Sequence, residues 1–287
     1  MPCLHITRQI VTQRSVFDTD RACCLLAIDD PTQKLVSEQN DSFRHRPSIT
    51  HTFRMTALPK ILTWFVPTAP ETLHAHFLEA PIVTFRSGDI IQHEYEPYDA
   101  LYWVESGLVG QAVINHALAK PLAMNLYPTG TMLGFINLFT GLPSPRRLVA
   151  QLPGVVLRRI SKAKLMAAIE HDAKALKTTA CWCEEASKSE LIGMEALFTL
   201  SADERLALFF TSAAATCGQL TDDGRAYDLP PLVTRAALCD VVYVTAVTLD
   251  RLTADWRRQE LLDRAPTGGW RVNANLVHRM VPWLDQH

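Results

Sequence analysis

The sequence predicts an α+β fold in which an all-β domain is followed by a long helix and then by a second domain of helices and hairpins. Short apolar runs separated by turn residues recur from Ile82 to Ile160, which is typical of a sandwich or barrel of short strands. From Ser161 to about Phe198 there is almost no glycine or proline. Apolar side chains return there every three to four residues, which is the period of a helix.

The composition is that of a soluble globular protein and not of a membrane or secreted one. Of the 287 residues, 48% are hydrophobic and 20% are charged, which is ordinary for a soluble globular protein. No apolar run is long enough to span a membrane, and the first residues lack the basic and apolar segments of a secretion signal. Seven scattered cysteines favour reduced thiols over a disulfide framework. We therefore expect a cytoplasmic protein.

Four segments are expected along the chain. Residues 1–57 are polar, mixed in charge and without sustained periodicity, which predicts a poorly ordered arm. Residues 58–160 form the β-barrel domain, residues 161–199 the long helix and residues 200–287 the C-terminal domain. In the barrel, strands are expected at residues 82–85, 89–92, 101–104, 109–113 and 155–160.

An apolar stripe runs along the predicted long helix and includes Leu176, Cys183, Met194 and Leu197. In a monomer this stripe would face water, so we expect it to pair with a second copy of the chain. Cys183 lies on the stripe and Cys181 is close to it. Both are interpreted as small hydrophobes, and a redox-sensitive pair near the two-fold axis is the alternative.

The C-terminal segment carries the signals of capped helices and tight turns. Ser201 and Glu204 have the spacing of a capping box, so a helix should begin there. Thr234 and Thr245 are suited to cap two short helices joined by a turn of about four residues, and Thr267–Gly269 turns a final hairpin. Two short helices followed by a β wing form a winged helix-turn-helix.

In this order, the elements over residues 75–275 resemble those of the CRP/FNR family of regulators. The resemblance is carried by Phe85–Ile91, Leu101–Gly107, Gly130–Gly134, Leu200–Ala207, Leu229–Pro230 and Thr234–Leu238. The first two stretches are similar to the opening strands of the family's cyclic-nucleotide-binding-type β-barrel, and the third to the entry of its phosphate-binding cassette. The others are similar to the hinge and start of its DNA-binding domain. The resemblance implies a homodimeric DNA-binding transcription regulator and leaves RNA polymerase open as a further partner.

The cassette departs from that of cAMP binders. Phe135 follows Gly134 where those proteins place a glutamate for the ribose hydroxyl. Arg146 and Arg147 supply guanidinium groups without the family's Arg-Ser pair, and Glu190 stands where the long helix would touch the base. Losing such contacts costs on the order of 3–5 kcal/mol, so no response to cAMP is expected. Phe135, Arg146, Arg147 and Glu190 are our candidates for an effector pocket.

The resemblance also places the helix that begins at Thr245 in the major groove of DNA. Arg251 falls on the family's recognition-helix arginine, and Arg251 and Thr248 are candidates for base contacts. Thr234 and Arg235 are candidates for phosphate contacts. The full predicted DNA-binding set is Thr234, Arg235, Thr245, Thr248, Arg251 and Arg271.

The net charge of the C-terminal segment is compatible with a second function, which acts through protein partners. Residues 201–287 contain nine arginines, no lysine and eleven acidic residues, which leaves two net negative charges. Because phosphate neutralisation drives DNA affinity, this balance predicts weak or narrowly focused binding. A protein of the same fold that acts through protein partners with little DNA binding is therefore an alternative.

A redox- or haem-responsive sensor is the remaining alternative. Cys3 with Cys23-Cys24 does not reproduce the compact cysteine cluster of an iron–sulfur sensor. His74, His76 and His93 are a weak haem signal among ten scattered histidines. The sequence contains no Walker loop, nucleophile elbow or zinc-binding spacing, so neither an enzyme nor a metal or cofactor is expected.

Overall fold

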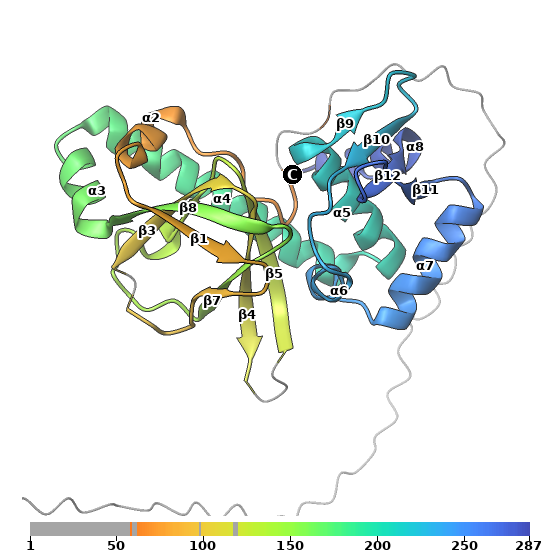
Figure 1. The fold of residues 1–287 in the computed structure, drawn as a ribbon, viewed down its shortest axis with the longest axis horizontal. Coiled ribbons are helices and arrows are strands. Elements are labelled where there is room, and N and C mark those ends of the chain that lie inside the picture. Colours follow the sequence, from red (N-terminus) through yellow and green to blue (C-terminus); the bar gives the residue numbers. More distant parts are fainter. Residues whose placement is uncertain (1–57, 59–61, 98, 117–119) are drawn as a thin grey trace, which may run out of the picture. The chain divides into compact units, whose positions relative to one another are not determined.

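The computed structural model describes residues 58, 62–97, 99–116 and 120–287 (Figure 1). Its N-terminal part contains two four-stranded antiparallel sheets. A short α2 (Glu71–His74) and a 3-10 turn (Ala75–Phe77) precede them. One sheet has the order β1 (Ile82–Arg86), β8 (Gly154–Ser161), β3 (Ala100–Ser106) and β6 (Met132–Leu133). The other has the order β2 (Ile90–Gln92), β7 (Arg146–Ala150), β4 (Leu108–Asn115) and β5 (Lys120–Pro128). The arm expected over residues 1–57 lies outside the described residues.

The two sheets do not close into the barrel that was predicted. Among the described strands, no ladder joins one sheet to the other. Two edge strands are very short, because β6 has two residues and β2 has three with an irregular register between Ile90 and Gln92. Such edges offer too few backbone groups to continue a ladder. The sheets instead share one core, to which Leu101, Val109 and Leu157 contribute.

The predicted long helix is divided into α3 (Lys162–Ile169) and α4 (Ala173–Thr199). The break follows from a capping residue inside the segment. Asp172 has an extended backbone with φ −111° and ψ 97°. Its Oδ1 accepts hydrogen bonds from the backbone N–H groups of Lys174 and Ala175, at 2.9 and 3.0 Å. A new helix therefore begins directly after Asp172.

Segment 62–67 crosses α4 at close range. A β-carbon on Gly193 would lie 2.8 Å from Cδ1 of Trp64, so the absence of a side chain permits this approach. Ser189 Oγ lies 2.6 and 2.8 Å from the carbonyl oxygens of Leu62 and Phe65, and Trp182 Nε1 donates to the carbonyl of Pro67 at 3.0 Å. These contacts fix one side of α4 against the preceding chain.

The C-terminal part combines helices with one small antiparallel sheet. Its elements are α5 (Ala202–Cys217), β9 (Gln219–Leu220), β10 (Ala226–Leu229), α6 (Arg235–Val242), α7 (Ala246–Arg258), β11 (Leu262–Arg264), β12 (Trp270–Asn273), α8 (Ala274–His278) and α9 (Val281–Leu284). The strand order is β11-β12-β10-β9. The capping box predicted at Ser201 and Glu204 is confirmed, because each side chain accepts a hydrogen bond from the other residue's backbone N–H.

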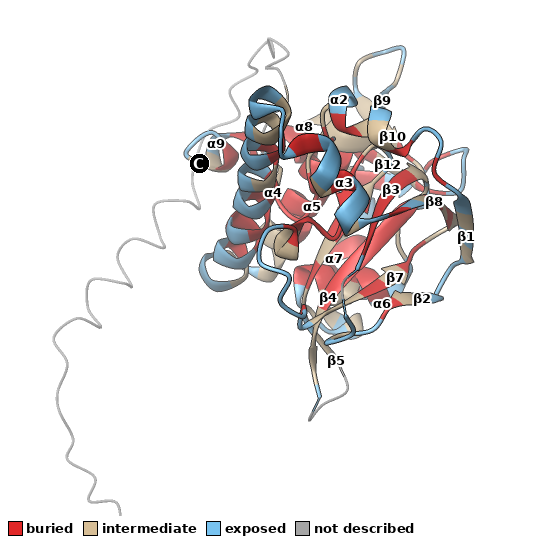
Figure 2. Cartoon of the chain, turned by 90° about the vertical axis from the view of Figure 1, so that its left-hand side faces the viewer, coloured by how far each residue is buried: buried red, intermediate tan, exposed pale blue. Residues whose placement is uncertain are grey.

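The core of this part surrounds α5. Residues 206–214 of α5 are all buried, and Phe210 packs edge-on against Trp256 of α7 and Trp270 of β12. Trp256 Nε1 also donates a hydrogen bond to Asp203 Oδ1 at 3.0 Å. Figure 2 shows buried residues on the inner side of the helices and an exposed outer side on α4. Anchored by Leu249, Leu252 and Trp256, α7 leaves its opposite face to solvent.

Candidate nucleic-acid interface

A three-residue turn joins α6 to α7. Tyr243, the first residue after α6, has a φ of 51° and a ψ of 60°, which lie in the left-handed region that favours glycine. Arg205 of α5 supports this turn by donating hydrogen bonds to the carbonyls of Leu200, Val242 and Tyr243, at 2.6, 2.8 and 3.1 Å. The guanidinium group thus satisfies carbonyls that the end of α6 leaves without a helical partner. Arg205 thereby ties α5 to the turn between α6 and α7.

The predicted threonines cap the two helices. Thr234 Oγ1 accepts a hydrogen bond from Ala237 N at 3.1 Å and begins α6. Thr245 Oγ1 accepts one from Thr248 N at 3.2 Å and begins α7, and the hydroxyls of Thr245 and Thr248 lie 2.9 Å apart. Both helix N-termini therefore carry oriented hydroxyl groups and the positive end of a helix dipole, which suits a phosphate.

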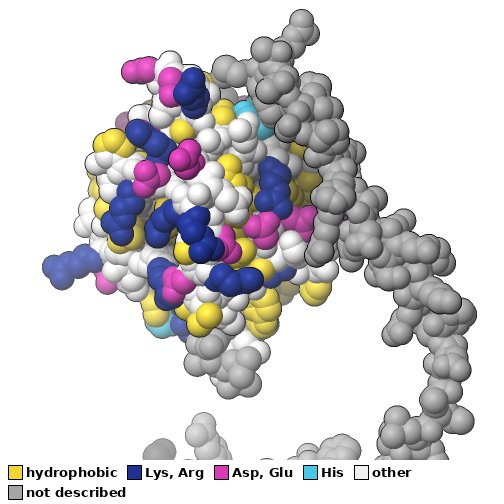
Figure 3. Space-filling model, turned by 90° about the vertical axis from the view of Figure 1, so that its right-hand side faces the viewer, with side chains coloured by type: hydrophobic (Ala, Val, Ile, Leu, Met, Phe, Trp, Pro, Cys, Tyr) yellow, Lys and Arg dark blue, Asp and Glu magenta, His cyan; other side chains and the backbone are white. Residues whose placement is uncertain are grey.

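Most arginines near α7 are paired within the chain. Arg235 donates to Asp250 Oδ1 at 2.8 Å and to the carbonyl of Ala246 at 3.1 Å. Arg271 of β12 forms two hydrogen bonds with Asp228 of β10, at 2.7 and 2.8 Å. These bonds lower the pKa of Asp250 and of Asp228 below their usual value. Figure 3 views the side on which α7 lies in Figure 1, and arginine and lysine side chains spread over that face with acidic side chains between them.

Arg251 differs from these arginines. Its side chain is exposed on α7 and, within the described part of the chain, it has no hydrogen bond or ion pair. The neighbouring acids have other partners, since Asp250 binds Arg235 and Asp255 binds Arg258. Val247, one turn earlier on the helix, is 78% exposed. The outer face of α7 therefore offers a free guanidinium group beside an apolar side chain.

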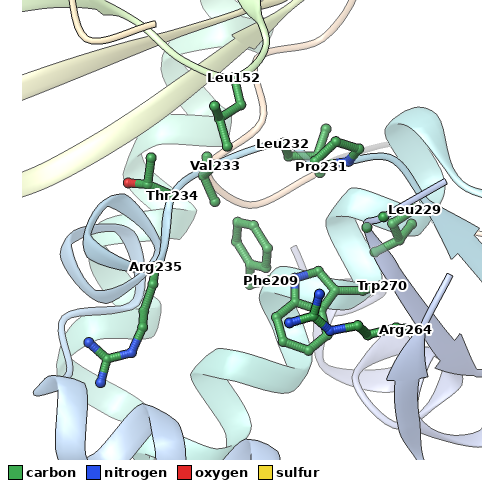
Figure 4. Close-up of a pocket in the computed structure, with 12 residues that line it drawn as sticks. Leu152, Phe209, Leu229, Pro231, Leu232, Val233, Thr234, Arg235, Arg264 and Trp270 are labelled. Carbon is green, nitrogen blue, oxygen red and sulfur yellow. The ribbon is translucent and has the colours of Figure 1, made fainter.

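A cavity of about 250 Å³ lies beside this interface (Figure 4). Its lining is mostly apolar and comes from the loop before β8, from α5, from the end of β10 and the loop after it, from the start of α6 and from the β11–β12 hairpin. The main apolar residues are Leu152, Phe209, Leu229, Pro231 and Trp270. In Figure 4 the guanidinium of Arg235 points away from these apolar side chains, toward α7. Arg235 thus points toward α7, where it donates a hydrogen bond to Asp250.

Three of the four effector-pocket candidates come together between α4 and the second sheet. Arg146 Nη1 donates a hydrogen bond to Glu190 Oε2 and another to Gln111 Oε1, the latter at 2.7 Å. The hydroxyl of Tyr127 lies 2.9 Å from Glu190 Oε1. Phe135 packs against Tyr127 and against Trp182 of α4, at centroid distances of 6.2 and 5.0 Å. The pocket is therefore filled by the chain's own side chains.

Arg147 lies outside this pocket. Successive residues of a strand point to opposite faces, so Arg147 points away from Glu190 when Arg146 points toward it. Arg147 instead forms two hydrogen bonds with Glu94, at 2.8 and 2.7 Å. This pairing lowers the pKa of Glu94 to about 2. Arg147 thus belongs to an ion pair on the other face of β7.

The exposed seam of α4 differs from the predicted stripe. Leu176 and Cys183 are half-buried against the core shared by the sheets, and Leu197 is half-buried against the C-terminal core, while Met194 is 49% exposed. A set of residues spaced alternately by three and four is exposed throughout, and we call it the α4 seam. It consists of Lys177, Ala180, Glu184, Ser187, Leu191, Met194 and Phe198. Its last three members are large and apolar, with Phe198 84% exposed.

The thiols and histidines give little support to a redox or haem sensor. Burial raises the pKa of the Cys183 thiol to about 12, so it is protonated and unreactive at neutral pH. His74 stacks on Trp103 and lies 3.3 Å from Glu105. The described histidine, cysteine and acidic residues form no group of three that could hold a metal ion. Cys3, Cys23 and Cys24 lie outside the described residues.

Of the described helices, none is long and apolar enough to cross a membrane.

Comparison with known proteins gives structural matches alone. No protein-family model matches the chain, and no curated protein matches it in sequence. FixK2 from Bradyrhizobium japonicum superposes with a TM-score of 0.59 at 18% identity, over 71% of this chain and 96% of that one. The c-di-GMP responsive global regulator CLP of Xanthomonas campestris gives 0.55 at 14% identity, over 71% and 99%. A transcriptional regulator of the CRP/FNR family from Thermus thermophilus gives 0.53 at 20% identity, over 72% and 99%. The chain therefore has the fold of the CRP/FNR transcription regulators.

Proposed function

We propose that this chain is a DNA-binding transcription regulator of the CRP/FNR type that acts as a homodimer. The observation that carries the proposal is the outer face of α7, where an unpaired arginine stands on the second helix of a helix-turn-helix followed by a hairpin. The fold shared with known regulators supports the same assignment. Together, α6, α7 and the β11–β12 hairpin form a winged helix-turn-helix.

In the complex we place α7 in the major groove, with the copy from the second protomer one helical turn away. Arg251 donates two hydrogen bonds to the O6 and N7 edge of a guanine, and Thr248 lies one turn earlier. The exposed Val247 is suited to contact the methyl group of a thymine. Thr234, Arg235, Thr245 and Arg271 then contact phosphates, with Arg235 and Arg271 exchanging their acidic partners for the DNA backbone.

A salt titration tests the proposal. Genomic fragments that bind the purified protein are selected, and affinity for one of them is measured from about 50 to 200 mM salt. The logarithm of the binding constant should fall linearly with the logarithm of the salt concentration, with a slope that corresponds to about four to six phosphates for the dimer. Absence of binding at low salt would instead favour the same fold acting through protein partners. The excess of acidic residues over arginines in residues 201–287 is the observation in favour of that second function.

We also propose that the protein does not respond to cAMP. The ribose acceptor of the cassette is replaced by Phe135, which is 3% exposed and packed against Trp182. The space bounded by Gln111, Gly134, Ile136, Asn137 and Ser144 is too narrow to take a sphere the size of a water molecule, so a nucleotide has no room there. Isothermal titration calorimetry should therefore give no heat of binding with cAMP or cGMP up to about millimolar concentration. Micromolar affinity would show that the pocket opens and that the argument from Phe135 fails.

A further inference from the structure

A buried carboxylate stands at the centre of the pocket between α4 and the second sheet. The side chain of Glu190 is 8% exposed, and that of Arg146 is 24% exposed. One carboxylate oxygen accepts from Arg146 and the other lies 2.9 Å from the Tyr127 hydroxyl. Gln111 Oε1 accepts a hydrogen bond from Arg146 Nη1 at 2.7 Å and lies 3.0 Å from the same hydroxyl, whose single hydrogen is given to Gln111 or to Glu190. Each oxygen of the carboxylate therefore lies against a different donor group.

Because Glu190 is buried, its carboxylate depends on the groups that surround it. A carboxylate removed from water is stable only when its oxygens are hydrogen-bonded and a cation is close. Arg146 and Tyr127 come from β7 and β5 of the sheet, whereas Glu190 comes from α4. The donors thus form a site on the sheet, and the carboxylate is brought to that site by a different element. Phe135 packs against the ring of Tyr127 and against Trp182, so one side of the site is apolar and buried.

We propose that Arg146, Tyr127 and Gln111 form a binding site for a carboxylate, and that the chain's own Glu190 is its resident ligand. An intramolecular carboxylate is always present at high effective concentration, so the site stays occupied without an external effector. If the protein is the regulator proposed above, its sensor domain is then held in one state by a covalently attached ligand. The regulatory meaning rests on that proposed function, whereas the binding site does not.

The proposal is tested by emptying the site and refilling it. Glu190→Ala should lower the melting temperature in chloride buffer, because Arg146 loses its buried partner. Sodium formate at about 100 mM should then raise the melting temperature of the variant by about 3–5 °C, saturably, compared with chloride at equal ionic strength. The wild-type protein should show no such saturable rise, since its own side chain fills the site. Arg146→Met combined with Glu190→Ala should abolish the response to formate.

Glu94→Ala provides the matched control. It removes the partner of Arg147 on the opposite face of the same strand, and the Glu94 side chain, at 9% exposed, is about as buried as that of Glu190. The described hydrogen bonds of the Arg147 guanidinium include none with a tyrosine or a glutamine, so the full set of groups in the proposed site is absent there. The melting temperature of Glu94→Ala should not respond to formate. Equal responses of Glu190→Ala, the double variant and Glu94→Ala would overturn the proposal, because they would show a general salt effect.

If Glu190→Ala does not fold in chloride, recovery of folded protein in formate supports the site, and failure in both buffers counts against it. None of these measurements uses DNA. A failure here is therefore distinguishable from a failure of the proposed function, which the salt titration tests separately.

Discussion

Simultaneous replacement of Leu191, Met194 and Phe198 by aspartate is expected to convert the proposed homodimer to monomers. These residues form the apolar end of the α4 seam and are 65%, 49% and 84% exposed in a single chain. The spacing of the seam, alternately three and four residues, is that of helices that pack along a two-stranded coiled coil. Each large apolar side chain buried at such an interface contributes about 1.5–3 kcal/mol, and a two-fold axis presents each residue twice.

The triple variant should therefore weaken dimerisation by more than about a thousandfold, and sedimentation velocity over a concentration series measures this. Lys174→Asp is the matched control, since it adds a carboxylate to an exposed position of the same helix outside the seam. The control should remain dimeric. A triple variant that sediments as the wild-type dimer would show that another surface joins the protomers. In that case Leu176, Cys183 and Leu197, which lie half-buried along the predicted stripe, would be the next residues to test.

Arg251→Ala is expected to weaken binding to a selected genomic site by about tenfold or more. A bidentate contact between a guanidinium group and guanine contributes about 1–3 kcal/mol of discrimination against other bases. Because Arg251 has no hydrogen bond or ion pair within the described part of the chain, its removal should leave the melting temperature nearly unchanged. Fluorescence anisotropy with the selected site and with a site that lacks the guanine measures both affinity and specificity.

Two further arginines serve as comparisons for Arg251. Arg258→Ala removes an arginine of the same helix that is paired with Asp255, and it should change the affinity little. Arg235→Ala should lower affinity for all sequences alike, as the loss of a phosphate contact does. Equal binding of wild type and Arg251→Ala to the selected site would refute the base contact and favour the function through protein partners.

Local signals in the sequence predicted much of the fold correctly. The capping box at Ser201 and Glu204 and the caps at Thr234 and Thr245 are present in the structure, because each depends on atoms within a few residues of one another. The strands predicted at residues 82–85, 89–92, 101–104, 109–113 and 155–160 correspond to β1, β2, β3, β4 and β8, whereas β5 and β7 were not predicted. The break between α3 and α4 also has a local cause, the helix cap at Asp172. The cap was not predicted from the sequence, because the apolar residues keep their helical spacing on both sides of it.

The candidate sites were only partly predictable. Sequence placed Arg251 on the outer face of α7, but it did not reveal that Asp250 and Asp255 are bound to other arginines. It named Arg146 and Glu190 separately as pocket residues without indicating that they pair. Tyr127 and Gln111 carried no signal of their own, since a tyrosine and a glutamine in short strands are ordinary. Only the register of β4 with β5 and β7 brings them beside Arg146.

The sequence by itself determined the order of the elements, their caps and the residue types available at each face, because these depend on interactions between near neighbours in the chain. Tertiary structure alone decided that the sheets remain open, that Arg147 pairs with Glu94, and that the seam of α4 runs through Leu191 and Phe198 rather than Leu176 and Leu197. It also decided that Glu190 meets Arg146 across 44 residues of sequence. Such choices depend on which surfaces the whole chain buries together, and the free energy of that burial is shared among residues far apart in the sequence.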